Sequence, residues 1–187
     1  VMTYLDVLKY GKPVGDSIAI IGAGGIGFDT AEYLLADDPQ DDEVSNFARQ
    51  WGIDQTWQHR GGICEPELNH AHKRTVYLLQ RKKSKVGAGL GKTTGWIHRT
   101  GLKNKGVVMM PSCTYEKIDD QGLHITVDGS EQILDVDNVV ICAGQDPMRD
   151  LVEGLNKPHH LIGGADVAAE LDAKRAIDQG TRLAATI

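Results

Sequence analysis

Six residues near the N-terminus have the types and the spacing needed to hold a diphosphate. Gly22-Ala23-Gly24-Gly25-Ile26-Gly27 matches the pattern G-x-G-x-x-G, in which backbone amides bind phosphate oxygens. Gly22 allows a tight turn, Gly24 lets the amides approach the phosphates, and Gly27 lets a helix pack closely on a strand. The pattern therefore predicts a dinucleotide-binding turn, and the alternative is a tight turn with a purely structural role.

The segments on either side of these glycines must position them. Residues 17–21 form a short, continuous apolar run, which is typical of a strand buried on both faces. A helical pattern follows, with Ala31, Leu34 and Leu35 on its apolar side, and Pro39 ends it. The start of that helix presents unpaired N–H groups and a partial positive charge, which favour a bound phosphate.

The end of the next strand indicates which dinucleotide is bound. Residues 75–80 form a second buried strand, and a basic run over 81–85, headed by Arg81 and Lys82, follows it. An NAD or FAD site usually carries Asp or Glu here to accept from ribose hydroxyls, whereas Arg and Lys neutralise a 2′-phosphate. The basic run therefore predicts NADPH in preference to NADH, and the alternative is a solvated basic turn.

The separation between Gly27 and Gln80 exceeds the usual spacing of about 20 residues for such a site. Residues 37–74 account for the difference, as an excursion inserted between a helix and its next strand. The excursion begins with acidic residues, contains a short helix over 44–51, and continues as a loop with scattered histidines. No motif within it indicates a function.

Two weaker patterns are interpreted as structural. Residues 87–94 resemble a P-loop, but Val86 stands where the first glycine of G-x-x-x-x-G-K-[ST] belongs, so no second nucleotide site is predicted. Asp29 and Glu32 lie on the first helix, where either is a candidate for contact with a nicotinamide carboxamide. A solvated helix face is the preferred interpretation for both.

Composition limits the partners and the compartment. The chain has 187 residues, 41% of them hydrophobic, and a net charge of −6, which argues for a packed core and against nucleic acid as a partner. Its cysteines form no C-x-x-C pair, and Cys64, His70 and His72 lack a fourth zinc ligand, so we predict no metal and a reduced, cytoplasmic setting. No apolar run approaches the roughly 18 residues that indicate a membrane span.

The rest of the first part of the chain alternates helices and strands. A helix is predicted over 95–105, a strand over 107–110, a β-meander over 113–136, and a buried strand over 138–142 that ends in Ala143-Gly144. Strands that alternate with helices predict a parallel sheet covered by helices. The expected fold is therefore α/β and Rossmann-like, an FAD/NAD(P)-binding domain of three layers with a parallel sheet and a small β-meander.

The C-terminal segment predicts a short strand over 160–162 and then a long helix. Asp166 is expected to cap that helix, which runs to about residue 185. Small residues at steps of three and four form a stripe that allows a close approach: Ala169, Ala173, Ala176, Gly180 and Ala184. We expect a sheet to pack on it, and the alternative is a flat ligand. These patterns divide the chain into a nucleotide-binding domain over 1–144 and a C-terminal segment over 145–187.

Taken together, these segments resemble the C-terminal part of bacterial NADPH-dependent 2,4-dienoyl-CoA reductases. Those enzymes belong to the old-yellow-enzyme-like flavoproteins, which include trimethylamine dehydrogenase. The resemblance covers the whole chain and rests on five stretches: SIAIIGAGGIGFDTAEYL, LLQRKKSKVGAGLGKTTGWIHRTGL, YEKIDDQGLHI, VDNVVICAGQDP and HLIGGADVAAELDAKRAIDQGTRLA. The stretch GLGKTTGWIHRT and the last one are the most specific.

The resemblance implies a larger enzyme and a role for each matching residue. An N-terminal TIM barrel would hold FMN and the fatty acyl-CoA substrate, a 4Fe-4S cluster would relay electrons, and an FAD domain would accept hydride from NADPH. The implied cofactor contacts are Gly22, Gly24, Gly25 and Gly27 on the pyrophosphate, Arg81 and Lys82 on the 2′-phosphate, Ala143 and Gly144 at the return into the FAD domain, and Gly164 and Asp166 on FAD.

The chain also departs from the complete family pattern. It contains no barrel, no cluster cysteines and no first FAD-binding βαβ unit, so no catalytic residue is assigned in it. One alternative is another flavin-dependent oxidoreductase of amine dehydrogenase or enoate reductase type; the lack of a C-x-x-x-x-C pair counts against a disulfide-type reductase. The other alternative is a non-enzymatic domain that senses nucleotides.

Overall fold

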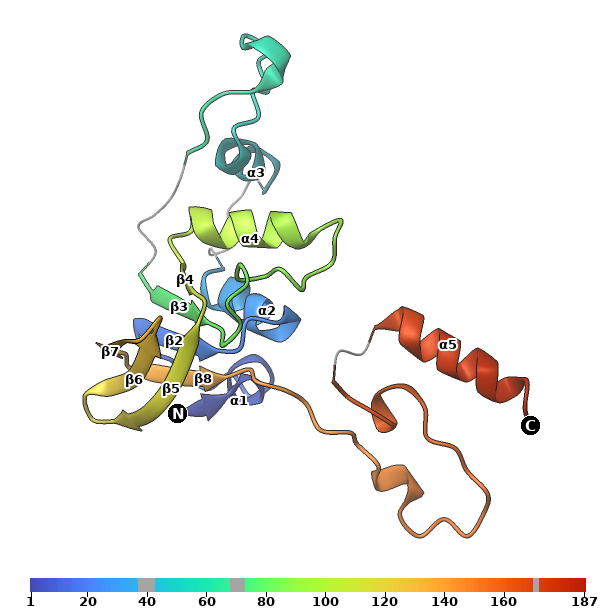
Figure 1. The fold of residues 1–187 in the computed structure, drawn as a ribbon. Helices are drawn as coiled ribbons and strands as arrows, with labels where there is room; N and C mark the ends of the chain where they lie inside the picture. The colour runs from blue at the N-terminus through green and yellow to red at the C-terminus, as the bar shows by residue number, and fades with distance from the viewer. Residues whose placement is uncertain (37–42, 68–72, 170–171) are drawn as a thin grey trace. The chain divides into compact units, whose positions relative to one another are not determined.

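The computed structural model describes residues 1–36, 43–67, 73–169 and 172–187. The chain divides into two compact units, Val1–Ala143 and Gly144–Ile187, and each is described by itself (Figure 1). His70 and His72, which the sequence analysis considered as metal ligands, lie outside the described residues. No helix in the described ranges is both long and apolar enough to cross a membrane.

A five-stranded sheet forms the centre of the first unit, with the strand order β1-β8-β2-β3-β4. Its paired strands all run parallel, as the continuous apolar runs predict. The strands are β1 (Met2–Thr3), β2 (Ser17–Ile21), β3 (Thr75–Leu79), β4 (Val108–Met110) and β8 (Asn138–Ile141). The helix α2 (Gly25–Leu34) follows β2, and the chain returns beside β2 at β3, so the glycine motif directly follows the central strand of the sheet.

Helices cover one face of this sheet (Figure 1). They are α1 (Tyr4–Leu8), α2 (Gly25–Leu34) and α4 (Gly95–Asn104), with α3 (Glu43–Trp51) and the short 3-10 helix η1 (Arg60–Gly62) in the excursion. The predicted short helix of the excursion is therefore present. Its Trp51 ring meets the Trp96 ring of α4 edge to face, with 6.2 Å between centroids, which attaches the excursion to that helix.

An antiparallel sheet of three strands covers the other face, formed by β5 (Cys113–Asp119), β6 (Gly122–Val127) and β7 (Ser130–Leu134). The turn between β6 and β7 uses Asp128 and Gly129, with φ of 48° and 85°. A two-residue hairpin of this kind needs positive φ at both central positions, which Asp-Gly tolerates. The predicted β-meander is confirmed.

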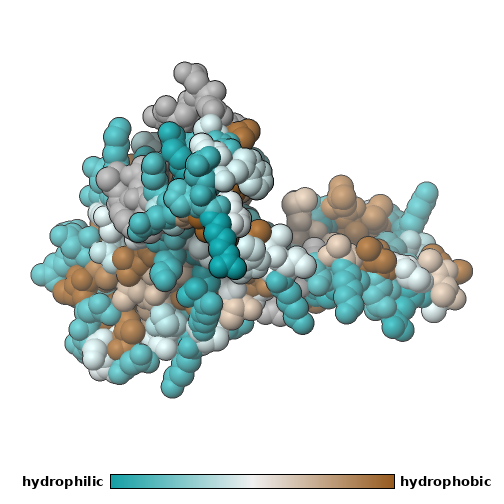
Figure 2. Space-filling model, turned by 90° about the horizontal axis from the view of Figure 1, so that it is seen from above, coloured by the Kyte–Doolittle hydropathy of each residue, from teal (hydrophilic) through white to brown (hydrophobic). Residues whose placement is uncertain are grey.

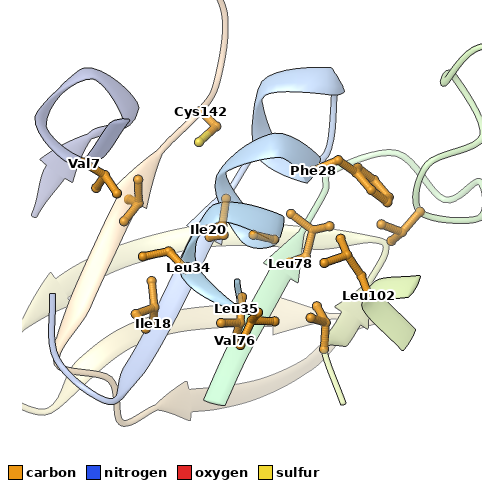
Figure 3. Close-up of a cluster of buried hydrophobic side chains, with 14 residues drawn as sticks. Val7, Ile18, Ile20, Phe28, Leu34, Leu35, Val76, Leu78, Leu102 and Cys142 are labelled. Carbon is orange, nitrogen blue, oxygen red and sulfur yellow. The ribbon is translucent and has the colours of Figure 1, made fainter. Parts of the chain in front are cut away.

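The central strand β2 is buried on both faces, and its side chains lie alternately in two separate hydrophobic cores. Ile18 and Ile20 lie in the cluster under α2, which Figure 3 shows together with Phe28 and Leu34. Ala19 and Ile21 face the other way, into a cluster built with the meander. Three layers result, so the predicted fold class is confirmed: α/β and Rossmann-like, with a parallel sheet and a small antiparallel sheet.

Asp137 ties the start of β2 to the start of β8. Its Oδ2 accepts hydrogen bonds from the backbone N–H groups of Asp16 and Ser17 and from the Ser17 hydroxyl, at 2.8–2.9 Å. These bonds, those from Ser17 foremost, hold the pKa of the Asp137 carboxyl below its usual value. We call this set of hydrogen bonds the Asp137 clamp. It lies at the end of the sheet opposite the glycine turn and sets the register of β2 and β8.

The Asp137 clamp predicts a loss of stability in acid. Because the folded state lowers this pKa, the stabilisation is fully present above the ordinary value of about 3.9 and is lost as the pH falls through the lowered one. Between about pH 7 and about pH 3 the urea midpoint of the wild type should fall further than that of Asp137→Asn, whose amide does not titrate. Equal falls in the two proteins would contradict this role.

The second unit corrects two predictions. It contains η2 (Asp150–Val152), η3 (Gly163–Ala165) and the helix α5 (Ala173–Ala184), and residues 160–162 form no strand. The helix begins at Ala173, where the Asp172 side chain accepts from the Arg175 N–H at 2.7 Å. Asp166 is therefore not its N-cap.

Asp166 is engaged elsewhere, which explains the difference. Its Oδ2 accepts from Gln179 Nε2 at 2.8 Å, and Gln179 Oε1 accepts from the Gly163 N–H at 2.8 Å. Gly163 adopts φ +60°, and the chain forms a 3-10 turn over Gly163–Ala165, directly before the predicted start of the helix. One side chain of α5 thus fixes the preceding turn, and the helix takes its cap from Asp172.

Within the second unit, part of the small-residue stripe faces that turn. Ala169 lies outside α5, while Ala176 and Gly180 lie within it. A Cβ built on Gly163 would lie 3.8 Å from the Ala176 Cβ, and one built on Gly180 would lie 3.8 Å from the Ile162 Cδ1. The small side chains therefore allow residues 162 and 163 to pack on the helix, and the expected contact of the stripe with a sheet stays a prediction.

The second unit has no hydrophobic core in the residues that can be described. Over 144–169 and 172–187, no hydrophobic side chain is buried, and Figure 2 shows apolar groups on the surface of this unit. The exposed large hydrophobic side chains are Met148, Leu151, Leu155, Ile162, Val167, Ile177 and Ile187. A segment that buries so little of its own apolar surface has little to hold it folded by itself.

Candidate nucleotide-binding site

The glycine motif lies where the order of the strands reverses. From β2 the chain moves to β3 and β4 on one side, and it later returns to β8 on the other side. Because the strands are parallel, Gly22 after β2, Arg81 after β3 and Ala143 after β8 follow carboxyl ends at the same edge of the sheet. Open α/β sheets bind their ligands at such a switch point.

Gly22 and Gly27 are required by the packing of the turn. Gly22 has φ +112°, and a Cβ there would lie 2.6 Å from the carbonyl oxygen of Cys142. A Cβ on Gly27 would overlap the Gly22 carbonyl oxygen. These two glycines let α2 start directly above the sheet, which is the geometric role that the motif predicts for them.

Gly24 and Gly25 differ, because nothing in the packing requires a missing side chain there. A Cβ built on either would have no heavy atom within 4 Å among the described residues. Gly24 is the N-cap of α2 with φ −84° and ψ −171°, a conformation open to other residues. The bare backbone at these positions borders open space, which fits a diphosphate approaching closely.

The electrostatics of α2 favour an anion at that end. No side chain of the described residues caps its N-terminus, whereas Thr3 caps α1 and Asp172 caps α5. At the C-terminus of α2, Arg74 Nη1 donates to the Leu34 carbonyl at 2.9 Å and Lys105 Nζ donates to the Leu35 carbonyl at 2.7 Å. The two cations stabilise the negative end of the helix dipole and leave its positive end facing the glycine turn.

The basic run lies beside the glycine turn. Leu79 pairs with Ile21 in the parallel register, so Arg81 and Lys82 emerge next to the turn that begins at Gly22. Both basic side chains are exposed. The Gly22 N–H donates to the Leu79 carbonyl at 3.0 Å, which ties the two strand ends together. Glycine amides and basic side chains therefore share one edge, as a dinucleotide with a 2′-phosphate requires.

The remaining predicted FAD contacts are divided between the two units. Ala143 and Gly144 are exposed, follow β8, and mark the boundary between the units. Gly144 has φ +96°, which favours glycine at this exit. Gly164 and Asp166 belong to the 3-10 turn of the second unit and its end. Their contacts with a cofactor stay predictions.

Cys142 lies directly behind the glycine turn, but it is not a reactive thiol. It is buried, and its Sγ lies 3.6 Å from the Thr30 hydroxyl, which itself donates to the Ile26 carbonyl. Burial raises the pKa of the Cys142 thiol to about 11, and burial also raises the pKa of Cys113. Both thiols stay protonated at neutral pH, so neither is suited to attack a disulfide.

The other candidate residues have structural partners. Gly87 has φ +80° and lies against Phe28 of α2, where a Cβ would come within 2.7 Å of the ring. This close approach packs the P-loop-like segment on α2. Glu32 Oε1 pairs with His98 Nδ1 at 2.8 Å and joins α2 to α4, while Asp29 is exposed. The residues that the structure describes contain no cluster of three metal-binding side chains.

Sequence reasoning missed the residues that support the site from outside the motif. The cations that cap α2 come from Arg74, at the end of the excursion, and from Lys105, after α4. The Gln80 side chain folds back on the basic turn. These contacts join residues up to 70 positions apart, and no local pattern in the chain signals the longest of them.

The family model for pyridine nucleotide-disulphide oxidoreductases matches residues 4–174, and thus most of the chain. The chain belongs to the pyridine nucleotide-disulphide oxidoreductase family. It is accordingly a domain of the kind found in pyridine nucleotide-dependent flavoproteins, and its family binds FAD and NAD(P)H. The glycine turn, the open backbone at Gly24 and the uncapped start of α2 fit such a nucleotide.

Two known proteins are similar to this chain. A metal reductase of Desulforamulus reducens is 25% identical over 150 residues, which are 80% of this chain and 21% of the relative. A solved structure of 2-naphthoyl-CoA reductase with 2-naphthoyl-CoA superposes with a TM-score of 0.65 at 19% identity, over 99% of this chain and 23% of that one. The second likeness shows the fold. The chain spans less than a quarter of the length of either protein.

Proposed function

We propose that this chain is the NADPH-binding portion of a flavin- and iron–sulfur-dependent 2,4-dienoyl-CoA reductase. In that enzyme, hydride would pass from NADPH to FAD for the reduction of unsaturated fatty acyl-CoA. The observation that carries the nucleotide assignment is the open glycine backbone at Gly24 beside a strand end that bears Arg81 and Lys82 in place of a carboxylate. The five stretches that resemble the dienoyl-CoA reductases support the substrate class.

Each residue has one task in this proposal. The amides at Gly24, Gly25 and Gly27 would hold the pyrophosphate at the positive end of α2, and Gly22, whose N–H donates to the Leu79 carbonyl, would make the turn that exposes them. Arg81 donates to the 2′-phosphate as a planar fork, and Lys82 adds charge. When bound, NADPH supplies a hydride, two electrons with one proton, which FAD takes up, leaving NADP⁺. The residues of this chain orient the nucleotide, and the redox chemistry belongs to the cofactors.

The second unit fits a role as part of an FAD domain. Residues 1–144 would form the NADPH-binding domain, and 145–187 would complete FAD binding through Gly164 and Asp166. The absence of buried hydrophobic side chains in its described residues supports this role, since its exposed apolar groups need a partner surface. FMN, the 4Fe-4S cluster and the acyl-CoA site would belong to other parts of the enzyme, working in the cytoplasm.

The test of the nucleotide assignment is the coenzyme preference of Arg81→Ala. Loss of a charged hydrogen-bonding partner of the 2′-phosphate should weaken NADPH binding by roughly tenfold to a hundredfold and leave NADH binding nearly unchanged. Titration of the full chain with each coenzyme measures both affinities. Arg60→Ala, which removes the same charge from an exposed position in η1, should change neither. An unaltered preference in Arg81→Ala would rule out the assigned contact.

The substrate class requires a separate experiment on the whole enzyme. NADPH oxidation by the full-length flavoprotein should depend on a 2,4-dienoyl-CoA. The 2-naphthoyl-CoA reductase carries a CoA thioester substrate in its name, so 2-naphthoyl-CoA serves as a comparison substrate. Turnover with an amine or another enoate only would favour the other flavoenzymes, and nucleotide binding without any flavin-linked turnover would favour a sensing domain.

A further inference from the structure

The Gln80 side chain closes the basic turn that follows β3. Its Nε2 donates hydrogen bonds to two backbone carbonyl oxygens, that of Lys82 at 3.0 Å and that of Ser84. Carbonyl oxygens only accept, so the partners themselves identify the contacting atom as the amide nitrogen. Both N–H groups of one side chain therefore hold residues 80–84 in a single compact turn.

Backbone bonds attach this turn to the segment after β4. The Gln80 N–H donates to the Met110 carbonyl at 2.9 Å, and the Gln80 carbonyl accepts from the Cys113 N–H at 3.0 Å. The Lys82 carbonyl, which Gln80 holds from one side, accepts from the Ser112 N–H at 3.1 Å. The turn is thus held by its own first residue and by a neighbouring strand connection.

The turn needs such support because of its charge. Four of its five residues from 81 to 85 are cationic: Arg81, Lys82, Lys83 and Lys85. Like charges at this spacing repel one another and favour a spread-out conformation. A turn that is already ordered binds a phosphate with less loss of conformational entropy than one that must be ordered by the ligand.

We infer that Gln80 is a positioning residue for recognition of the 2′-phosphate. Its amide holds the basic turn in the conformation that presents Arg81 and its neighbours to the phosphate. Gln80 occupies the strand end where NAD-binding sites carry a carboxylate, and a carboxylate here would face two carbonyl oxygens that it cannot hydrogen-bond. The inference rests on the proposed function, because it concerns the same site.

Two substitutions of Gln80 distinguish the loss of its amide hydrogen-bond donors from the addition of a negative charge. Gln80→Met keeps the length of the side chain and removes both donors; Gln80→Glu keeps the shape, removes the donors and adds a negative charge. The probes are adenosine 2′,5′-bisphosphate and 5′-AMP, titrated calorimetrically into the full chain. Gln80→Met should weaken the bisphosphate roughly tenfold and leave 5′-AMP within about twofold, and Gln80→Glu should weaken the bisphosphate further. Gln132→Met, at an exposed glutamine of β7, should bind both probes as the wild type does.

The outcomes distinguish this inference from the proposed function. If the wild type does not prefer the bisphosphate over 5′-AMP, the NADPH assignment fails and the inference fails with it. If the wild type has that preference and Gln80→Met keeps it, or if both probes weaken equally, the inference alone is overturned. Gln80→Ala replaces a Met variant that does not fold. Failure of both variants to fold would show a purely structural role and would also overturn it.

Discussion

Gly27→Ala is expected to destabilise the chain by about 3 kcal/mol and to abolish binding of the pyridine nucleotide. The added Cβ would overlap the carbonyl oxygen of Gly22, a backbone atom without a flexible side chain to move aside. Gly22 itself is held by its hydrogen bond to the Leu79 carbonyl, and the preceding Ile21 carbonyl accepts from the Cys142 N–H at 2.8 Å. Relief of the overlap therefore requires α2 to lift off the sheet. Urea unfolding followed by circular dichroism measures the loss.

The matched control is Gly101→Ala in α4. A Cβ there has no heavy atom within 4 Å among the described residues, and the position is helical. Alanine in a helix interior is favoured over glycine by roughly 1 kcal/mol, so this variant should be as stable as the wild type or more so. If the two variants unfolded at the same urea concentration, the close packing of Gly27 would be refuted.

Gly24→Ala is expected to fold normally and to bind NADPH at least roughly tenfold more weakly, a loss of about 1.4 kcal/mol or more. The backbone at Gly24 is extended and its Cβ position is open, so stability should change by no more than about 1 kcal/mol, the usual effect at an N-cap. In the complex, the added methyl group would occupy space that the pyrophosphate needs. Calorimetric titration with NADPH measures the affinity, and circular dichroism checks the fold.

Gly89→Ala is the control for this loss of binding. Gly89 is exposed in the P-loop-like segment, and its Cβ position is likewise free of heavy atoms within 4 Å among the described residues. That variant should bind NADPH with wild-type affinity. Normal NADPH binding by Gly24→Ala would mean that the phosphates do not approach this part of the turn, and the diphosphate cradle would have to be placed elsewhere.

Much of the first unit could be predicted because its signals are local. The buried run of β2, the glycine turn and the start of α2 adjoin one another in the chain, and the sequence signal for each lies within a few residues. The Asp128-Gly129 hairpin likewise follows from the backbone preferences of two residues. Elements of this kind keep the same conformation in most tertiary settings, so the fold class and the candidate site both followed from the sequence.

The second unit was predicted less well because its conformation depends on distant partners. Asp166 has the features of an N-cap, but Gln179 competes for its carboxylate from thirteen residues away. The stripe of small residues correctly signals a close approach, and yet it does not identify what approaches, which proved to be Ile162 and Gly163. When local capping and packing preferences allow several arrangements of equal strength, the choice between them depends on which contacts the folded chain can make at the same time.

Patterns within the chain were enough to predict an α/β Rossmann-like fold, the position of its glycine turn, and a basic strand end beside that turn. The tertiary structure showed that the glycines of the motif differ in role. Gly27 is needed for packing, whereas the space beside Gly24 is open. Folding also brought Arg74 and Lys105 to the far end of α2 and Gln80 onto the basic turn. Backbone preferences act over a few residues, whereas steric overlap and hydrogen bonding act between any atoms that folding brings together.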